Sequence, residues 1–373
     1  MKKKILIIFG TRPEAIKMAP LVKEFQKHPS VFETKVCVTA QHREMLDQVL
    51  DFFQIITDFD LDLMKPDQNL YGLTTDIITN LKPVLEGYNP DYVFVHGDTT
   101  TTMAGSIASF YSGAKICHVE AGLRTHNKLS PFPEEINRQI TGRVCDFHFA
   151  PTETSKANLI KENIQVDSIL VTGNTVIDAL LDSVERVNEA PSALINELST
   201  TIGDKELILV TGHRRENHGA GFIRICEALK KIAKDNTDRL IVYPVHLNPK
   251  VQEPVKRILT DVANVMLIDP LAYQDFIWMM NRAKIIITDS GGGQEEAPSL
   301  GKPVLVMRDT TERPEAVDAG TVILVGTDKN LIVTEALDLL NNADRFEKMS
   351  RLHNPYGDGK ACERIVNFIN KLI

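Results

Sequence analysis

The stretch KIIITDSGGGQEEAPSLG, residues 284–301, carries the pattern that indicates the fold class most directly. A short run rich in isoleucine ends in a polar Asp-Ser pair, three glycines make a turn, and a helix-forming segment follows. Such a strand–turn–helix unit is typical of the carboxyl edge of a parallel sheet. The glycine turn offers backbone amides that suit a phosphate. Glu295 and Glu296 follow at once, however, and carboxylates repel phosphate.

Short apolar runs of this kind recur along the whole chain, with amphipathic segments between them. Runs that are apolar throughout are typical of strands buried on both faces, and the repeated strand–helix order predicts right-handed crossovers and parallel sheets. The predicted strands are 4–10, 34–40, 91–97, 114–120, 147–151, 169–173, 207–212, 240–246, 265–270, 284–290, 303–307 and 321–326. The fold class is therefore α/β, with two Rossmann-like doubly wound domains expected to face each other across a cleft.

The length of 373 residues favours two domains. A polar, irregular stretch at 189–206 separates the two series of strands, which places the boundary between about 170 and 205. We expect an N-terminal domain at 1–175, a C-terminal domain at 176–355, and a final helix at 356–373. Composition does not decide which domain carries that helix, and packing back on the N-terminal domain is one of the two options.

Composition excludes several classes of protein. Lys and Arg total 42 and Asp and Glu total 50, so the net charge of −8 argues against a nucleic-acid partner. The five cysteines are scattered and form no C-x-x-C pair, so a disulfide framework or structural zinc is not expected and a reducing cytoplasm fits. The first apolar run is too short for a signal peptide, and no stretch is long enough to span a membrane.

Charged residues follow the first predicted strand in FGTRPEAIKMAPL, residues 9–21. Gly10 permits a tight turn, and Pro13 suits the start of a helix. Arg12 and Lys17 then lie near a helix N-terminus, where anions are favoured. The two residues form either a clamp for a phosphate or substrate, or a surface turn with incidental charges.

Three acids follow later strands and form the candidate catalytic cluster. Asp98 and Glu120 come at strand ends in VHGDTTTT and VEAGLRT, and Glu134 begins a helix in PFPEEINR. Clustered carboxylates raise one another's pKa, as general acid–base catalysis near neutral pH requires. Asp98 could instead be a helix N-cap. Arg138 is a further catalytic candidate that shares a helix face with Glu134: it either orients Glu134 towards the cleft or forms a plain surface ion pair with it. The acids lack metal-ligand spacing, so a metal site is the weaker interpretation.

The second half carries a candidate anion site. His213 ends a strand in TGHRREN beside Arg214, and His246 and Arg313 are further candidates. In the opening stretch, Ser290 with the amides of Gly291 and Gly292 suits a diphosphate, and an acid inside the helix suits ribose hydroxyls. The predicted ligand is a nucleoside diphosphate joined to a hydroxyl-rich sugar.

At these motifs the chain resembles the bacterial non-hydrolysing UDP-N-acetylglucosamine 2-epimerases. The matching motifs are FGTRPEAIKMAPL, TAQHREMLDQVL, VHGDTTTT, VEAGLRT, FPEEINR, TGNTVIDALL, GHRREN, YPVHLNP, TDSGGGQEEAPSLGKPVLVMRDTTERPEAV and NPYGDGKA. The resemblance implies a glycosyltransferase-B type fold, a homodimer, and no cofactor, metal or covalent nucleophile. It implies interconversion of UDP-GlcNAc and UDP-ManNAc by elimination of UDP to 2-acetamidoglucal and re-addition, in supply of a cell-surface polysaccharide.

The resemblance also assigns residues. Substrate contacts or catalysis fall to Arg12, Lys17, Asp98, Glu120 and His213. The UDP site, with Glu296 on the ribose, is implied at Phe276, Ser290, Gly291, Gly292, Glu296 and Arg313. Some relatives bind a second UDP-GlcNAc as an activator, and the corresponding residues are Gln41, Arg214 and His246. Gly293 departs from the pattern, which has a bulkier aliphatic residue there. A hydrolysing 2-epimerase, a glycosyltransferase and a non-catalytic nucleotide-sugar sensor remain alternatives.

Overall fold

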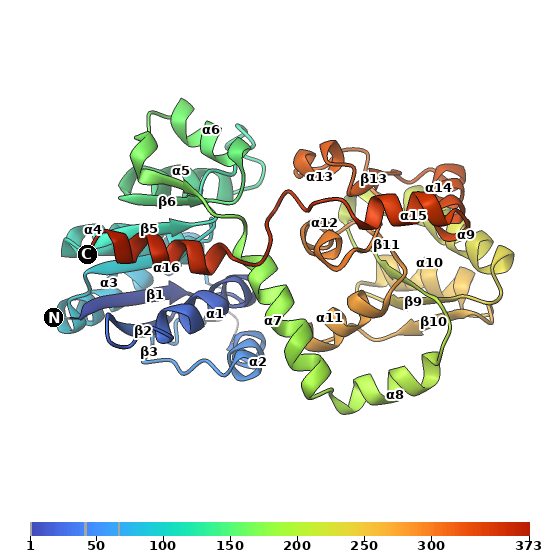
Figure 1. The fold of residues 1–373 in the computed structure, drawn as a ribbon, viewed down its shortest axis with the longest axis horizontal. Coiled ribbons are helices and arrows are strands. Elements are labelled where there is room, and N and C mark those ends of the chain that lie inside the picture. The colour runs from blue at the N-terminus through green and yellow to red at the C-terminus, as the bar shows by residue number, and fades with distance from the viewer. Residues whose placement is uncertain (1, 41–42, 66–67) are drawn as a thin grey trace. The chain divides into compact units, whose positions relative to one another are not determined.

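The computed structural model describes residues 2–40, 43–65 and 68–373. The chain divides into two compact units. Unit 1 consists of Met1–Ala179 together with Tyr356–Ile373, and unit 2 is Leu180–Pro355. The C-terminal segment therefore returns to unit 1 after the chain has passed through unit 2 (Figure 1).

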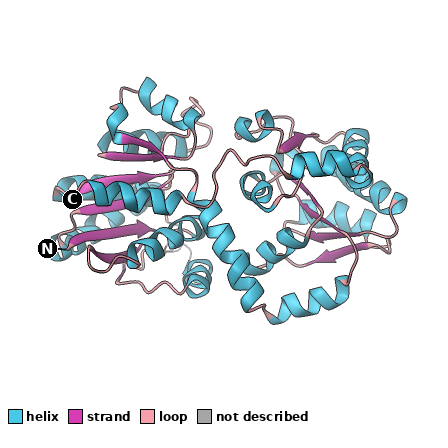
Figure 2. Ribbon diagram, in the orientation of Figure 1, coloured by secondary structure: helices cyan, strands magenta, loops and turns pink. Residues whose placement is uncertain are grey.

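Unit 1 is built on a parallel sheet of seven strands in the order β3-β2-β1-β4-β5-β6-β7 (Figure 2). The strands are β1 (Lys3–Phe9), β2 (Phe32–Val38), β3 (Phe59–Asp60), β4 (Tyr92–His96), β5 (Lys115–Val119), β6 (Phe147–Ala150) and β7 (Ile169–Val171). The helices are α1 (Arg12–Gln26), α2 (Arg43–Phe53), α3 (Leu70–Tyr88), α4 (Thr100–Ser112), α5 (Glu134–Val144), α6 (Glu153–Lys161), η1 (Val166–Ser168) and α16 (Ala361–Lys371). Helix α7 (Thr175–Glu189) begins in unit 1 and ends in unit 2.

Helices cover both faces of this sheet because its strands are apolar on both sides. Leu6 and Ile8 of β1 pack with residues of α3 and α4. On the other face, Phe94 of β4 meets Phe25 of α1 edge-on. Helix α16 packs against α1. This double covering confirms the predicted doubly wound architecture for unit 1.

The N-terminus of α16 is held by one buried side chain. The carboxylate of Asp178 in α7 accepts hydrogen bonds from the backbone N–H groups of Ala361 and Cys362, at 3.1 and 2.9 Å. Just before α7, Asn174 donates its N–H to the carbonyl of Tyr356 at 2.7 Å. The final helix therefore packs on unit 1, where a polar cap and apolar contacts hold it.

Unit 2 has a parallel sheet of six strands in the order β10-β9-β8-β11-β12-β13. The strands are β8 (Leu207–Thr211), β9 (Leu240–Pro244), β10 (Val265–Ile268), β11 (Ile285–Thr288), β12 (Val304–Val306) and β13 (Val322–Leu324). The helices are α8 (Ala193–Ile202), η2 (Arg215–Asn217), α9 (Ala220–Asp235), α10 (Pro249–Leu259), α11 (Tyr273–Arg282), α12 (Gly291–Glu296), η3 (Ala297–Leu300), α13 (Pro314–Asp318), α14 (Lys329–Asn341) and α15 (Ala343–Ser350).

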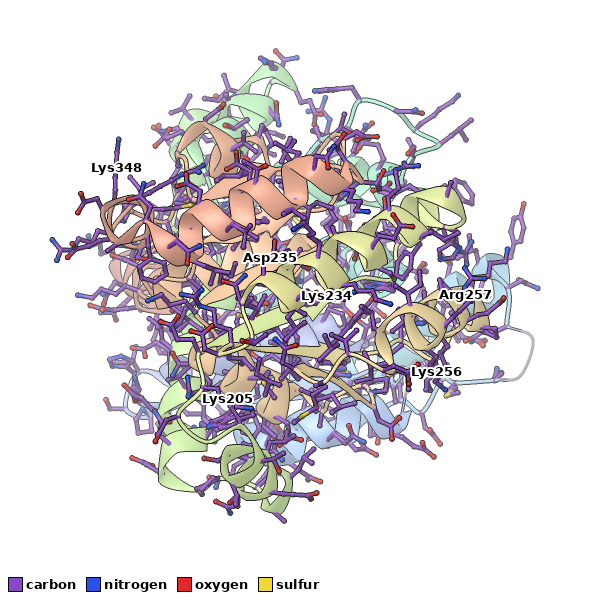
Figure 3. The ribbon with its side chains drawn as sticks, turned by 90° about the vertical axis from the view of Figure 1, so that its right-hand side faces the viewer. Lys205, Lys234, Asp235, Lys256, Arg257 and Lys348 are labelled. Carbon is purple, nitrogen blue, oxygen red and sulfur yellow. The ribbon has the colours of Figure 1, made fainter. Side chains whose placement is uncertain are left out.

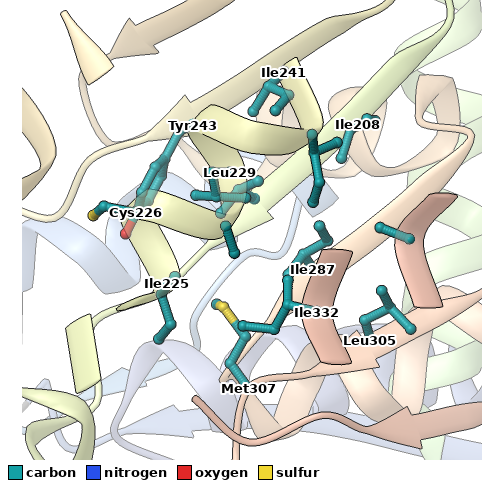
Figure 4. Packing of buried hydrophobic residues seen from close by; sticks show 14 of the residues in the cluster. Ile208, Ile225, Cys226, Leu229, Ile241, Tyr243, Ile287, Leu305, Met307 and Ile332 are labelled. Atoms are coloured by element: carbon teal, nitrogen blue, oxygen red, sulfur yellow. The ribbon is translucent and has the colours of Figure 1, made fainter. Parts of the chain in front are cut away.

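The core of unit 2 lies between its sheet and the helices α9, α10 and α14. Ile225 and Leu229 of α9 pack with Ile287 and Met307 from the sheet (Figure 4). The outer sides of these helices are charged, as Lys234 and Asp235 on α9 and Lys256 and Arg257 on α10 illustrate (Figure 3). The apolar residues of α10 recur at Val251, Val255 and Leu259, which is the spacing of one helix face.

The predicted strands are confirmed, with ends that differ by at most two residues. The two-residue strand β3 is too short for its pattern to be recognised. The irregular stretch expected at 189–206 is wrong, because it contains α8. The signal was present: Ser192 caps the helix, and Ile195, Leu198 and Ile202 are buried at helical spacing. Among the described residues, no helix combines the length and apolarity needed to cross a membrane.

Candidate active site

Each unit places its candidate residues where the strand order reverses. In unit 1 this point lies between β1 and β4, and in unit 2 between β8 and β11. Ligands of doubly wound sheets bind at the carboxyl ends of the strands beside such a point. Arg12, Asp98, His213 and Ser290 all follow one of these four strands, so the topology assembles one cluster in each unit.

The turns after β1 and β4 are tied together by Glu14, which the sequence analysis did not single out. Its Oε2 accepts hydrogen bonds from the N–H groups of Gly10 and Thr11, at 3.0 and 2.8 Å. Its Oε1 accepts from the hydroxyls of Thr99 and Thr102, at 2.6 and 3.2 Å. Thr11 and Glu14 form a capping box, whose Thr-x-x-Glu signal is readable in the sequence. Glu14 therefore fixes the starts of both α1 and α4.

Asp98 does not cap α4, because Thr99 does so by accepting the N–H of Thr102. The Asp98 side chain instead pairs with Arg138, with Oδ2 2.5 Å from Nη2. Arg138 also lies 3.4 Å from the buried carboxylate of Glu135. The expected Glu134–Arg138 pair is thus replaced by Asp98–Arg138, since α5 presents its buried face to the β4–α4 turn. Asn137 supports the same turn by donating to the Asp98 carbonyl at 2.9 Å.

Glu120 follows β5 in the left-handed backbone region, at φ 61°. Its Oε2 pairs with the ammonium of Lys17. The same oxygen lies 3.2 Å from Nε2 of His96, but this nitrogen is not aligned for a hydrogen bond. Burial acts to raise the pKa of Glu120, but the charges of Lys17 and His96 outweigh burial and hold that pKa well below its usual range. The expectation that clustered carboxylates raise one another's pKa is wrong for Glu120, because cations surround it.

Glu134 is half-buried in the first turn of α5, and no partner of its side chain is recorded within the described ranges. Arg12 is half-buried at the first position of α1.

Behind the β4–α4 turn, His118 lies within hydrogen-bond distance of the Gly97 carbonyl, at 2.7 Å. Burial lowers the pKa of His118 to about 3, so it is neutral and can donate its Nε2–H to that carbonyl. Among the residues that the structure describes, no group of three or more His, Cys, Asp or Glu side chains could hold a metal ion.

In unit 2, His213 lies in the loop between β8 and η2. Its ring stacks on that of His246 with centroids 5.2 Å apart and planes 13° apart. Burial lowers the pKa of His213, while the nearby carboxylate of Asp289 opposes the shift. Arg214 follows in the same loop, and its buried Nε has no hydrogen-bond partner among the described residues. The structure thus brings His213 and His246 together. Gln41, assigned with Arg214 and His246 to a possible activator site, lies outside the described residues.

The glycine turn begins α12, and Ser290 is its N-cap without a side-chain capping bond. A Cβ on Gly291 would lie 3.0 Å from the guanidinium carbon of Arg313, so the glycine lets that group approach. Arg313 donates from Nε to the buried Glu295 at 2.8 Å. The two acids of the opening stretch therefore differ: Glu295 is held by Arg313, and Glu296 lies beside Gly292.

Two further positions complete the unit 2 cluster. Gly293 is buried, and a Cβ there would lie 3.3 Å from the Thr288 methyl group, so Thr288 fills the space that a larger residue would take. Phe276 is half-buried on α11. The chemistry of the cluster is that of an anion site: backbone amides, a hydroxyl, a guanidinium and an imidazole, with one carboxylate left beside the glycines.

The model of the UDP-N-acetylglucosamine 2-epimerase family matches residues 23–370 of this chain. The chain belongs to the UDP-N-acetylglucosamine 2-epimerase family. It is 60% identical to the UDP-N-acetylglucosamine 2-epimerase of Escherichia coli K12, over 97% of each chain. The resemblance drawn from the motifs is confirmed at the level of the family.

Solved structures of other epimerases have the same fold. The UDP-GlcNAc 2-epimerase of Neisseria meningitidis, solved bound to UDP-GlcNAc, is 51% identical with a TM-score of 0.86, over 99% of this chain and 100% of that one. The enzyme of Methanocaldococcus jannaschii, in complex with UDP-GlcNAc and UDP, is 31% identical with a TM-score of 0.78, over 99% of both chains. These epimerases share the two parallel sheets with interleaved helices, so the predicted α/β fold class is confirmed.

Proposed function

We propose that this chain interconverts UDP-GlcNAc and UDP-ManNAc without releasing free sugar. The observation that carries the proposal is the Glu120 group, an ionised carboxylate held by Lys17 and His96 at the carboxyl edge of the unit 1 sheet. Its lowered pKa keeps the carboxylate ionised at neutral pH. Membership of the epimerase family supports the assignment.

The unit 2 cluster has the groups that would hold UDP. The amides of Gly291 and Gly292, the Ser290 hydroxyl and Arg313 suit the diphosphate, Glu296 suits the ribose hydroxyls, and Phe276 suits the base. His213 would assist departure of the diphosphate. Donors placed at the leaving group stabilise the charge that develops there.

The unit 1 cluster would act on the sugar. The C2–H bond breaks as a carboxylate takes the proton, and the C1–O bond breaks as UDP leaves with the electron pair, which gives 2-acetamidoglucal. UDP then adds back to C1, and an acid returns a proton to C2 from the opposite face. Asp98, Glu120 and Glu134 supply these proton transfers, Arg138 orients Asp98, and Arg12 and Lys17 contact the substrate.

An NMR time course with UDP-GlcNAc in heavy water tests this proposal, using the full chain without added cofactor. We expect UDP-ManNAc that carries deuterium at C2, because the proton that returns comes from an acid equilibrated with solvent. Free ManNAc with UDP would identify a hydrolysing enzyme. An unchanged spectrum, with binding of UDP still detectable, would identify a nucleotide-sugar binder instead.

We further propose a second UDP-GlcNAc that activates the enzyme through Gln41, Arg214 and His246. The buried Nε of Arg214 without a partner and the exposed ring of His246 are consistent with a ligand at that place. The M. jannaschii relative was solved with two nucleotide ligands, UDP-GlcNAc and UDP. Turnover that rises more steeply than first order in UDP-GlcNAc would support the activator, and hyperbolic kinetics would exclude it.

We also propose a homodimer that works in the cytoplasm and supplies ManNAc units for a cell-surface polysaccharide. All five cysteines are free, which fits a reducing compartment. A groove of about 340 Å³ between α3 and α4 is lined by both apolar residues, such as Leu85 and Tyr111, and charged ones, Lys82 and Glu86. Phe110 and Tyr111 are 59% and 75% exposed beside it. Apolar surface of this kind is typical of a protein interface.

A further inference from the structure

Asp289 is a fully buried carboxylate that directly follows β11 and precedes Ser290. Its Oδ2 accepts hydrogen bonds from the N–H groups of His213 and Arg214, both at 2.9 Å, and from Nδ2 of Asn217 at 3.3 Å. This oxygen anchors the loop after β8 through three hydrogen bonds. The other oxygen, Oδ1, is buried and makes no hydrogen bond within the part of the chain that the structure describes.

The unsatisfied oxygen faces His213. Nδ1 of the imidazole lies 3.7 Å from Oδ1, which is beyond hydrogen-bond length but within the range of an ion pair. A buried carboxylate oxygen without a partner is costly in free energy. The His213 side chain is 46% exposed, so the imidazole has room to move the few tenths of an ångström that a hydrogen bond would need.

The other charged or titratable groups that face His213 carry positive charge or can acquire it. They are Arg214 and His218 from the same loop and His246 from the loop after β9, and each acts to lower the pKa of His213. His246 accepts the N–H of Asn248 on its Nδ1 at 3.1 Å, so its neutral form carries the proton on Nε2. Asp289 is the one negative charge recorded as acting on His213 among the described residues.

We propose that Asp289 is a positioning residue that holds Nδ1–H of His213 and thereby presents Nε2 to the diphosphate of the nucleotide sugar. This inference rests on the proposed role of His213. When His213 is protonated, the carboxylate balances the positive charge, and Nε2–H donates to the oxygen on which negative charge develops. The same side chain thus fixes both the loop and the orientation of the imidazole, as carboxylates behind histidines do in other sites.

The substitution Asp289→Asn tests the inference. The amide oxygen can still accept the two backbone N–H groups, but an NH2 group replaces the oxygen that faces Nδ1. We expect the pKa of His213, followed by NMR of labelled histidine, to fall, because the charge that raises it is lost. We expect kcat to fall on the order of 100-fold through misplacement of the imidazole.

Asn217→Ala is the matched control. It removes the 3.3 Å bond to Asp289 and a 3.0 Å bond to the Met307 carbonyl, but it keeps the carboxylate. We expect the pKa of His213 to stay in place and kcat to change by no more than a few fold. Circular dichroism of each variant shows whether the fold is retained.

Three outcomes would overturn the inference. The first is an unchanged pKa of His213 in Asp289→Asn, and the second is an equal fall of kcat in both variants without a pKa change. The third is a further full loss of kcat when Asp289→Asn is added to His213→Ala, since the two losses should overlap. Absence of epimerisation by the unsubstituted protein would instead reject the proposed function, and the NMR titration would still decide whether Asp289 holds His213.

Discussion

Three acidic side chains of the two clusters are held by basic partners. Asp98 pairs with Arg138, Glu120 with Lys17, and Glu295 with Arg313. This pairing explains how a site rich in carboxylates can receive a diphosphate. The cations limit the repulsion that bare acids would cause, and those beside Glu120 hold its pKa well below its usual range.

The substitution Glu120→Gln should reduce kcat by about 10²- to 10⁴-fold, the usual contribution of a general acid or base. Glutamine keeps the size of the side chain but cannot accept the C2 proton. The measurement is the rate of UDP-GlcNAc epimerisation, with binding of UDP as a check that the site is intact. Glu153→Gln on the exposed side of α6 is the control and should behave as the unsubstituted protein. Full activity of Glu120→Gln would reject the acid-cluster mechanism.

At the scale of elements, Gly10 in the turn after β1 packs closely against one residue that follows β2 and one in the first turn of α4. Gly10 stands against the hydroxyls of Thr39 and Thr101, which lie 2.9 Å from each other. Both threonines are fully buried, so they have no free space to move into. The close packing around Gly10 therefore leaves no room for a larger residue at this position.

The substitution Gly10→Ala should destabilise the protein by about 1–3 kcal/mol, since the new Cβ would lie 2.0 Å from the Thr39 hydroxyl. Chemical denaturation followed by circular dichroism measures the change in unfolding free energy. Gly87→Ala near the end of α3 is the matched control, because a Cβ there meets no atom within 4 Å. Alanine at 87 should be neutral or stabilise by about 0.5–1 kcal/mol through its helix propensity. Equal effects of the two substitutions would contradict this account of Gly10.

At the scale of the whole molecule, the buried cores lie apart from the surface on which we propose that a second copy docks. Each unit has its own sheet and its own buried core. Three strongly exposed aromatic residues, Tyr71, Phe110 and Tyr111, belong to α3 and α4 of unit 1. These two helices are therefore the part of the surface that we expect a second copy of the chain to cover.

The substitution Tyr111→Asp should convert the proposed dimer to a monomer, because it places a charge on the apolar groove between α3 and α4. Light scattering coupled to size-exclusion chromatography measures the mass. Leu331→Asp on α14, where the leucine is 40% exposed, is the control and should leave the mass unchanged. A dimer that persists in Tyr111→Asp would move the interface elsewhere.

Local pattern was sufficient for much of the fold. Strands buried on both faces must be apolar throughout, so the runs at KILIIFG and KIIITDS are visible without any structure. The glycine turn after β11 and the capping box at Thr11 and Glu14 are equally local. Helix α8 was missed although its cap and spacing were readable, and β3 was missed because two residues carry no periodicity.

The α/β class, the two series of strands, the family and the residues at the strand ends can all be read from the order of amino acids. Which of those residues pair with one another is visible only in the folded chain. Arg138 pairs with Asp98, 40 positions away, rather than with its helix neighbour Glu134. Asp289 reaches the loop of His213 across 76 positions, and α16 returns to α1. The physical reason is that such pairs depend on which strand ends become neighbours, and this is set by the order of strands in the sheet.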